Sequence, residues 1–279
     1  MNTLIVEAGS SKTDSVLLID GQPEPTVKSR GINPVTDKHY DAAIRELCHH
    51  YSDKEHIDRI RYYGSGCINE TVNYRIKKGF ADFFHRSIDI EVRDDLIAVA
   101  HGLCGSNPGI VVIMGTGSNT GYYNGQVITD GYRSCGYLIG DEGSGFRLGQ
   151  QLIKLYARGL LPKEDQHNIQ DQVAVSPELV VSNIYESENP RTSIASWASL
   201  LKDCSTAVRQ SICYHVFGEL IRDVLTPLYL KHQVPIYISG SIAHYFQEEL
   251  LSVIKSSDII VPSIATSPLE GLIIYHSHE

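Results

Sequence analysis

The chain has 279 residues, of which 42% are hydrophobic, enough to bury one large core or two smaller ones. Its 33 acidic residues exceed its 24 basic ones by nine, and no Lys/Arg-rich run offers a footprint for phosphate backbones, so nucleic acid is excluded as an expected partner. The start lacks a basic segment followed by a long apolar one, and no later stretch has 18 uninterrupted apolar residues, which argues against secretion and a membrane span. The six scattered cysteines form no C-x-x-C pair, which argues against a disulfide framework and predicts the cytoplasm.

The first half predicts a hairpin followed by alternating helices and strands. Strand Thr3–Ala8, a Gly/Ser turn over residues 9–12 and strand Ser15–Asp20 form the hairpin. A third extended piece near Thr26–Ser29 follows. Helices are then expected near Asp37–Tyr51, Thr71–Arg86 and Leu96–Leu103, and strands at Arg59–Tyr63 and Ile88–Arg93. This alternation predicts crossovers and parallel strand pairing.

The second half opens in the same way at Ile110. Its predicted strands are Gly109–Met114, Thr120–Tyr123, Gln126–Thr129, Pro235–Ser239 and Ile259–Val261, with helices near Phe146–Arg158 and Ala243–Lys255. The polar segment Pro162–Asn168 resembles a linker. A capping box made by Ser267, Pro268 and Glu270 predicts the start of a final short helix. Two similar halves predict two domains with the functional site in a cleft between them.

Three glycine-rich turns follow apolar strands, at residues 9–13, 115–119 and 240–241. Glycine lets backbone N–H groups converge on an anion and hydroxyls add donors, so each turn can hold phosphate, although each alone is equally typical of a hairpin. Their recurrence in two similar halves favours a shared ligand. A Walker P-loop is excluded because no G-x-x-x-x-G-K-[ST] occurs, and a Rossmann fingerprint is absent as well.

The motifs in these turns resemble one known family. EAGSSKTD (7–14), GTGSN (115–119), GDEGSG (140–145) and ISGSIA (238–243) are similar in order and spacing to the signature elements of the N-acetylglucosamine kinase-like ATPases of the actin-like ATPase superfamily. The run AHGLCG (100–105) and the ending SPLEGL (267–272) add to the likeness. The resemblance implies an α/β fold of two ribonuclease-H-like domains, each a mixed five-stranded sheet flanked by helices, with nucleotide between them. The first domain would comprise residues 1–106 and 267–279, and the second residues 107–266.

The resemblance also implies how ATP and Mg²⁺ are bound. Phosphate contacts fall on Gly9, Ser10, Ser11, Lys12 and Thr13 and on Gly115, Thr116, Gly117 and Ser118, and adenosine would lie against Gly240 and Ser241. Glu7 stands where the family usually has the Asp that helps to hold hydrated magnesium. Mg²⁺ commonly binds few carboxylates and several waters, so the longer side chain can still serve.

Phosphoryl transfer to a sugar hydroxyl needs a carboxylate to take the proton. Asp94 and Asp95 follow the strand Ile88–Arg93, where either could act as base or as helix N-cap. The resemblance selects Asp95 as the base and leaves Asp94 as a solvated neighbour. It also implies that Asn33, Asn119 and Asp141 contact the sugar, although an acid in the first turn of a helix is explained by the helix dipole as well.

The sequence therefore predicts a kinase that phosphorylates a small sugar, with the primary hydroxyl of an N-acetylated hexosamine as the expected acceptor. Apolar stripes in the helical middle of the chain also allow a homodimer. One alternative is an ATP-driven activator that passes electrons through an iron cluster, for which Cys104 and Cys135 are the loosely suitable pair. The other is a sensor of nucleotide or sugar without turnover.

Overall fold

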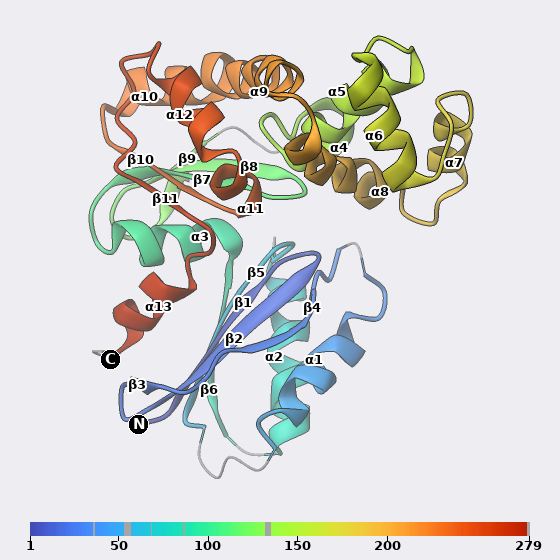
Figure 1. Ribbon diagram of the computed structural model, residues 1–279. Helices are drawn as coiled ribbons and strands as arrows, with labels where there is room; N and C mark the ends of the chain where they lie inside the picture. The colour runs from blue at the N-terminus through green and yellow to red at the C-terminus, as the bar shows by residue number, and fades with distance from the viewer. Residues whose placement is uncertain (36, 53–56, 68, 86, 132–134, 278–279) are drawn as a thin grey trace. The chain divides into compact units, whose positions relative to one another are not determined.

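The computed structural model describes residues 1–35, 37–52, 57–67, 69–85, 87–131 and 135–277. These form two compact units, each built around one β-sheet. The first unit comprises Met1–Pro108, Tyr123–Ile128 and Ser267–Glu279, and the second comprises Gly109–Tyr122 and Thr129–Thr266. In both units helices flank the sheet, as predicted (Figure 1). The nucleotide cleft expected between the units stays a prediction.

The sheet of the first unit has six strands at five positions. Its strands are β1 (Thr3–Ala8), β2 (Lys12–Ile19), β3 (Gln22–Pro23), β4 (Val27–Arg30), β5 (Arg59–Gly64) and β6 (Asp89–Asp94), in the order β3-β2-β1-β5-β6. The short strands β3 and β4 pair with opposite ends of β2, so they share one edge. β1 pairs antiparallel with β2 and parallel with β5, which in turn pairs parallel with β6. The predicted hairpin and crossovers are confirmed.

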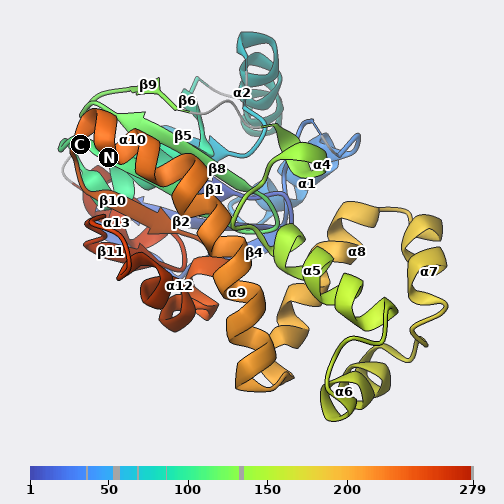
Figure 2. The same ribbon diagram turned by 90° about the horizontal axis from the view of Figure 1, so that it is seen from above.

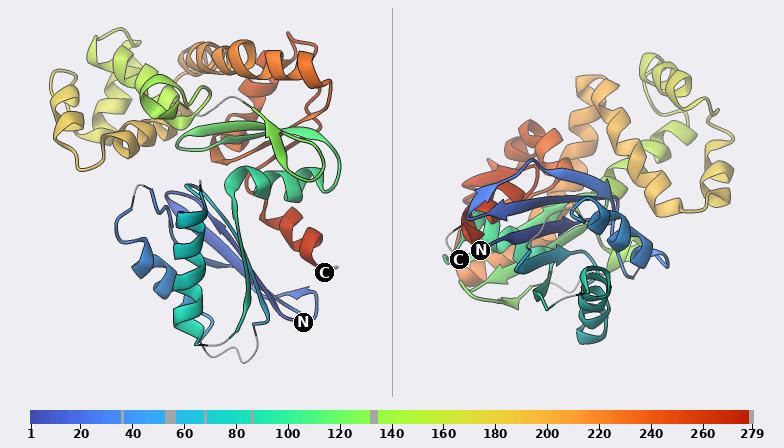
Figure 3. Two further views of the ribbon diagram at one scale, coloured as in Figure 1. Left: turned by 180° about the vertical axis from the view of Figure 1, so that it is seen from behind. Right: turned by 90° about the horizontal axis from the view of Figure 1, so that it is seen from below.

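Alternation of side chains along β1 explains why both faces of this sheet are covered. Leu4 and Val6 join one apolar cluster with residues of α1 (Tyr40–His49) and α2 (Glu70–Phe84), whereas Ile5 joins another with α3 (Asp95–Val99) and α13 (Leu269–His276). Successive strand residues point to opposite faces, so a strand with apolar side chains buried on both faces requires a helix layer on each side. Figure 3 shows α1 and α2 together on one face of the sheet.

The sheet of the second unit repeats this strand order. Its strands are β7 (Gly109–Met114), β8 (Ser118–Tyr123), β9 (Ile128–Asp130), β10 (Ile236–Ser239) and β11 (Ser263–Ala265), in the order β11-β10-β7-β8-β9. Parallel pairs join β10 to β7 and to β11. The first strand of each half is thus central, its hairpin partner lies on one side, and the two later strands lie on the other.

Helices make up most of the second unit. They are α4 (Gly136–Ile139), α5 (Gly145–Ala157), α6 (Lys163–Val173), α7 (Val180–Glu186), α8 (Pro190–Ser196), α9 (Thr206–Leu220), α10 (Thr226–His232), α11 (Ser241–Tyr245) and α12 (Gln247–Ile254). A π-helical turn at Ile221–Leu225 joins α9 to α10, and Figure 2 shows the two as one long helical run beside the sheet. Among the described helices, none has both the length and the apolar character needed to span a bilayer.

Several predicted elements differ in the structure. Pro162–Asn168 is not a linker but the start of α6, which is anchored because buried Asp165 accepts hydrogen bonds from the Ser205 backbone N–H (2.6 Å) and hydroxyl (2.7 Å). Ile259–Val261 is not a strand, and the pairing with β10 is made instead by Ser263–Ala265, after Pro262, which has no N–H to donate. The predicted helix end Arg86 lies outside the described residues; α2 itself begins at Glu70 and ends at Phe84.

The final helix also begins differently from the prediction. α13 starts at Leu269, with Pro268 at the N-cap position where the capping box expected Ser267. The Ser267 hydroxyl accepts the Leu269 N–H (3.1 Å) and donates to the Glu7 carboxylate (3.1 Å). Its partner is therefore an acid in β1, far away in the sequence, which no local pattern could reveal.

Candidate active site

The first predicted phosphate turn joins β1 to β2 and is closed by a hydrogen bond from the Gly9 N–H to the Lys12 carbonyl (2.8 Å). The segment after β4 packs directly on this turn, because a Cβ on Gly31 would lie 2.4 Å from the Ser10 carbonyl oxygen. The buried Asn33 amide then donates to the Ser10 hydroxyl (2.7 Å). The structure thus brings together a residue predicted for phosphate and one predicted for sugar.

The proposed base lies at the same edge of the sheet. Asp95 follows β6, and its Oδ2 accepts a hydrogen bond from the Ser65 hydroxyl (2.5 Å) at the end of β5. The Ser65 backbone N–H donates to the Ala8 carbonyl at the end of β1 (3.0 Å). The carboxyl ends of three adjacent parallel strands therefore present Gly9, Ser65 and Asp95 side by side, the arrangement in which α/β proteins place ligands.

Asp94 has a different role from its neighbour. It is the N-cap of α3, and its carboxylate accepts the Ile97 N–H (3.0 Å). It is half-buried rather than the solvated residue that we expected. The local sequence left two roles open for these acids, helix cap or base. Asp94 is the cap, and the role of Asp95 as base stays a prediction.

Glu7 belongs to a group of acids next to the turn of the hairpin. It lies directly across from Asp14 in the β1–β2 ladder, where Lys12 donates to one Asp14 oxygen (2.7 Å). Burial raises the pKa of the Glu7 carboxyl, the Lys12 charge and the Ser267 hydroxyl oppose this shift, and the charges of Asp14 and Asp95 add to it.

This group fits a hydrated magnesium ion. Oδ1 of Asp14 is buried and accepts no hydrogen bond from the residues that the structure describes, and the negative charges around Glu7 would be stabilised by a cation. The described residues contain no cluster of three or more His, Cys, Asp or Glu that could form an all-protein metal cage. Mg²⁺ commonly keeps several waters and needs only one or two carboxylates. Glu7, with Asp14, would therefore hold the metal.

The second and third predicted turns meet at the ends of β7 and β10. The Gly115 N–H donates to the Gly117 carbonyl (2.9 Å), and α5 braces the turn because the Gly145 N–H donates to the Gly115 carbonyl (2.8 Å). Gly240 has φ +125°, and a Cβ there would lie 2.2 Å from the Met114 carbonyl oxygen, so only glycine fits. Ser118 and Asn119 are the first residues of β8 rather than turn residues, and the Asn119 side chain accepts the Thr120 N–H (3.1 Å).

Asp141 lies buried beside the GTGSN motif. It has a positive φ of 56°, accepts a hydrogen bond from the Ser118 backbone N–H, and forms an ion pair with Arg191 (Oδ2 to Nη2, 3.1 Å). Burial raises the pKa of this carboxyl, and Arg191 and Ser118 partly offset the shift. Ser144 caps α5, so Asp141 stands before the helix and not in its first turn. The helix dipole therefore does not account for this acid.

Comparison with known proteins agrees with this architecture. A solved structure from Porphyromonas gingivalis, provisionally described as an N-acetylglucosamine kinase, is 28% identical, and the match covers 99% of each chain with a TM-score of 0.92. The predicted resemblance to the N-acetylglucosamine kinase-like ATPases is confirmed. A second structure with the same provisional description, from Chromobacterium violaceum, is 17% identical over 98% of each chain with a TM-score of 0.71, which shows the shared fold.

The sequence match to a curated member of these kinases is shorter. N-acetyl-D-glucosamine kinase from Dictyostelium discoideum is 28% identical over 103 residues, which is 37% of this chain and 31% of that protein. The aligned stretch therefore spans less than half of either protein. No protein-family model matches the chain.

Three residues beside the predicted site motifs were missed by sequence reasoning. Ser65 orients Asp95, and the Gly64-Ser65-Gly66 turn after a strand repeats the signal that identified the other turns. Asp14, opposite Glu7, stands within the first motif but received no role. Arg191 lies 50 residues from its partner Asp141 in the sequence, and nothing near it pointed to a site.

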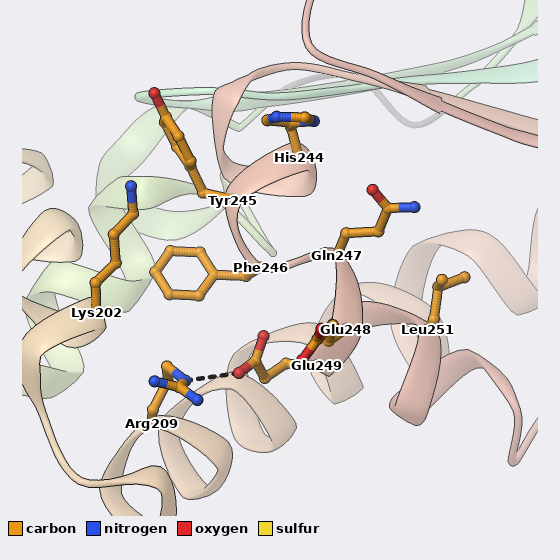
Figure 4. Close-up of a pocket in the computed structure, with 9 residues that line it drawn as sticks. All are labelled: Lys202, Arg209, His244, Tyr245, Phe246, Gln247, Glu248, Glu249 and Leu251. Carbon is orange, nitrogen blue, oxygen red and sulfur yellow. Dashed lines mark hydrogen bonds and ion pairs between the residues drawn. The ribbon is translucent and has the colours of Figure 1, made fainter.

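A cavity of about 480 Å³ lies in the second unit between α11 and α12, which follow the third turn, and the chain from Lys202 into α9 (Figure 4). It is lined by Lys202, Arg209, His244, Tyr245, Phe246, Gln247, Glu248, Glu249 and Leu251. The Lys202 ammonium stands 3.3 Å from the Tyr245 ring centre, and Arg209 is paired with Glu249 (2.7 Å). None of the residues predicted to bind nucleotide or sugar lines this cavity.

Proposed function

We propose that this protein is an ATP-dependent kinase that phosphorylates an amino sugar. N-acetylglucosamine is the expected acceptor and its primary hydroxyl, O6, the expected position. The names of the solved and curated relatives support this acceptor class, since they describe N-acetylglucosamine kinases.

One observation carries the proposal: a single sheet edge joins a phosphate-type turn, a polar amide and a carboxylate base. Asn33 is bonded to Ser10 in the turn, and Asp95 is bonded to Ser65 on the neighbouring strand end. Gly66 lies against Asn33, because a Cβ there would lie 2.7 Å from the Asn33 side-chain oxygen. A base that lies close in space to a phosphate turn suits phosphoryl transfer, which depends on positioning more than on covalent help from the protein.

Nucleotide binding is assigned to the three turns. The backbone N–H groups and hydroxyls of residues 9–13 and 115–118 would hold phosphate oxygens, and Gly240 and Ser241 would lie against adenosine. Glu7, with Asp14, would hold Mg²⁺, which when bound offsets the charge of the phosphates. The buried Asp14 oxygen without a hydrogen-bond donor supports this assignment.

Asp95 would act as the general base. The sugar hydroxyl oxygen attacks the γ-phosphorus, a new O–P bond forms, the bond from that phosphorus to the β–γ bridging oxygen breaks, and ADP leaves. The proton of the hydroxyl passes to Asp95, whose orientation is fixed by the Ser65 hydroxyl. Asn33, Asn119 and Asp141 would orient the sugar, for which a carboxylate is well suited because sugar hydroxyls donate to it.

The electron-passing alternative is poorly supported by the cysteines. Cys104 is buried in a π-helical turn, and burial raises the pKa of its thiol to about 12, which disfavours the thiolate that iron requires. All six cysteines lie in the described part of the chain and are thiols, which supports a reducing compartment and hence the cytoplasm. A homodimer, for which light scattering is the direct test, remains part of the proposal.

The test is a coupled assay of ADP release with a panel of hexoses and hexosamines, followed by NMR of the product. We expect N-acetylglucosamine to give the highest kcat/KM, with a phosphate-split signal at carbon 6. ADP release that no sugar accelerates, or iron and colour in the purified protein, would overturn the proposed function.

A further inference from the structure

Arg191 occupies a position that helix physics disfavours. It is the second residue of α8, after the N-cap Asn189 and Pro190, and the Asn189 side chain accepts the Thr192 N–H (3.1 Å). The N-terminus of a helix carries a partial positive charge, so a cation in the first turn is destabilising there. Local stability therefore does not explain an arginine at this point.

The contacts of Arg191 lie at the sugar-binding acid instead. Its Nη2 forms the ion pair with buried Asp141, and its guanidinium carbon lies 5.6 Å from the centre of the Tyr137 ring. Its Nε is buried and has no acceptor among the described residues. Gly117 of the phosphate turn adjoins the pair, because a Cβ there would lie 2.3 Å from Arg191 Nη2 and 2.6 Å from Asp141 Oδ2.

The backbone that carries Arg191 is held firmly. A Cβ on Gly149 of α5 would lie 1.9 Å from the Ile194 carbonyl oxygen of α8, so the two helices touch through their backbones. Arg191 is three residues before Ile194, nearly one turn away. Its guanidinium is thus brought to Asp141 by a preformed helix contact and not by a mobile loop.

We propose that Arg191 is a positioning residue for the sugar: it fixes the Asp141 carboxylate as an acceptor of sugar hydroxyl bonds and keeps it against the GTGSN motif. This inference rests on the proposed function and deepens it. With Oδ2 engaged by Arg191 and the carboxylate held by the Ser118 N–H, the orientation of both oxygens is set before sugar arrives. Without the guanidinium, burial would favour the protonated acid, which accepts fewer hydroxyl bonds.

The test compares Arg191→Gln and Arg191→Lys with the control Arg209→Gln. Arg209 has the same side-chain exposure as Arg191, 27%, and pairs with Glu249 at 2.7 Å, so its variant measures the cost of losing a similar ion pair elsewhere in the second unit. KM for the sugar, KM for ATP and kcat are measured across pH. The ¹³C carboxyl resonance of Asp141, identified by its loss in Asp141→Asn, is titrated in each protein.

Loss of a charge-assisted hydrogen bond predicts that Arg191→Gln raises the sugar KM by about tenfold or more, with KM for ATP nearly unchanged. We expect the acid limb of kcat/KM and the Asp141 titration to move to higher pH, and Arg191→Lys to restore both in part. An Asp141 titration unaffected by Arg191→Gln, or a sugar KM raised equally by Arg209→Gln, would overturn the inference. If wild-type protein phosphorylates no sugar, the proposed function fails, and the carboxyl titration still decides the role of Arg191.

Discussion

Replacing Asp95 by Asn, beside a matched Asp94→Asn variant, tests the base directly. The two acids are adjacent in the chain, and each accepts a hydrogen bond from a described residue, Asp95 from Ser65 and Asp94 from the Ile97 N–H. Asparagine keeps an oxygen that can accept either bond but removes the charge and the basic oxygen. The pair of variants therefore separates chemistry from structure at one place in the fold.

Both variants should fold, with small losses in stability. A hydrogen bond to a charged group contributes about 1.5–3 kcal/mol and a neutral one about 0.5–1.5, so Asp95→Asn should cost about 1 kcal/mol. Asn is as good an N-cap as Asp, so Asp94→Asn should lower the free energy of unfolding by only about 0.3 kcal/mol. Urea unfolding curves measure both values.

Their activities should differ greatly. General-base catalysis contributes about 10²–10⁴-fold, so Asp95→Asn should lower kcat for sugar phosphorylation by about that factor, whereas Asp94→Asn should stay close to wild type. The assay is coupled ADP release, with nucleotide binding followed by titration of a fluorescent ATP analogue. Wild-type turnover in Asp95→Asn, or an equal loss in both variants, would refute the assignment of the base.

Three further predictions concern the metal site, the last helix and the thiols. Because the folded pKa of Glu7 is raised, its ionisation destabilises the ligand-free protein as pH rises through that pKa; Glu7→Gln should therefore have the higher Tm at neutral pH without ligand and the lower Tm with ATP and Mg²⁺, and the same order in both conditions would contradict the metal role. Gly271→Ala should cost about 1–3 kcal/mol or more, since its Cβ would lie 1.8 Å from the Gly102 carbonyl oxygen, whereas Gly218→Ala, with open space in α9, should stabilise by about 0.5–1 kcal/mol; chemical denaturation of both variants is the measurement. One thiol, exposed Cys135, should react rapidly with a disulfide reagent at pH 8, because burial raises the pKa of Cys48, Cys67, Cys104 and Cys213 to about 12 and of Cys204 to about 11, and more than one fast thiol in the native protein would argue against this packing.

Much of the fold could be predicted because its signals are local. The strand Thr3–Ala8 was predicted with its observed bounds, since an apolar run ending at a Gly/Ser turn is a short-range pattern. The repeated hairpin likewise predicted that the two halves open alike, and the two sheets of the structure have the same strand order. The polar composition of Pro162–Asn168 led to a wrong prediction of a linker. The segment begins a helix whose Asp165 and Ile169 are buried against the rest of the second unit, and composition alone does not report such packing.

The site divides in the same way. The sequence by itself determined the three turns and the pair Asp94-Asp95 at a strand end, because glycine torsions and strand ends are set by a few neighbouring residues. Only the tertiary structure decided that Asp94 caps α3, that Ser65 holds Asp95, and that Arg191 reaches Asp141. The last two of these pairings join side chains 30 and 50 residues apart, and such contacts exist only after the elements have packed, as does the backbone contact of Gly149 with Ile194.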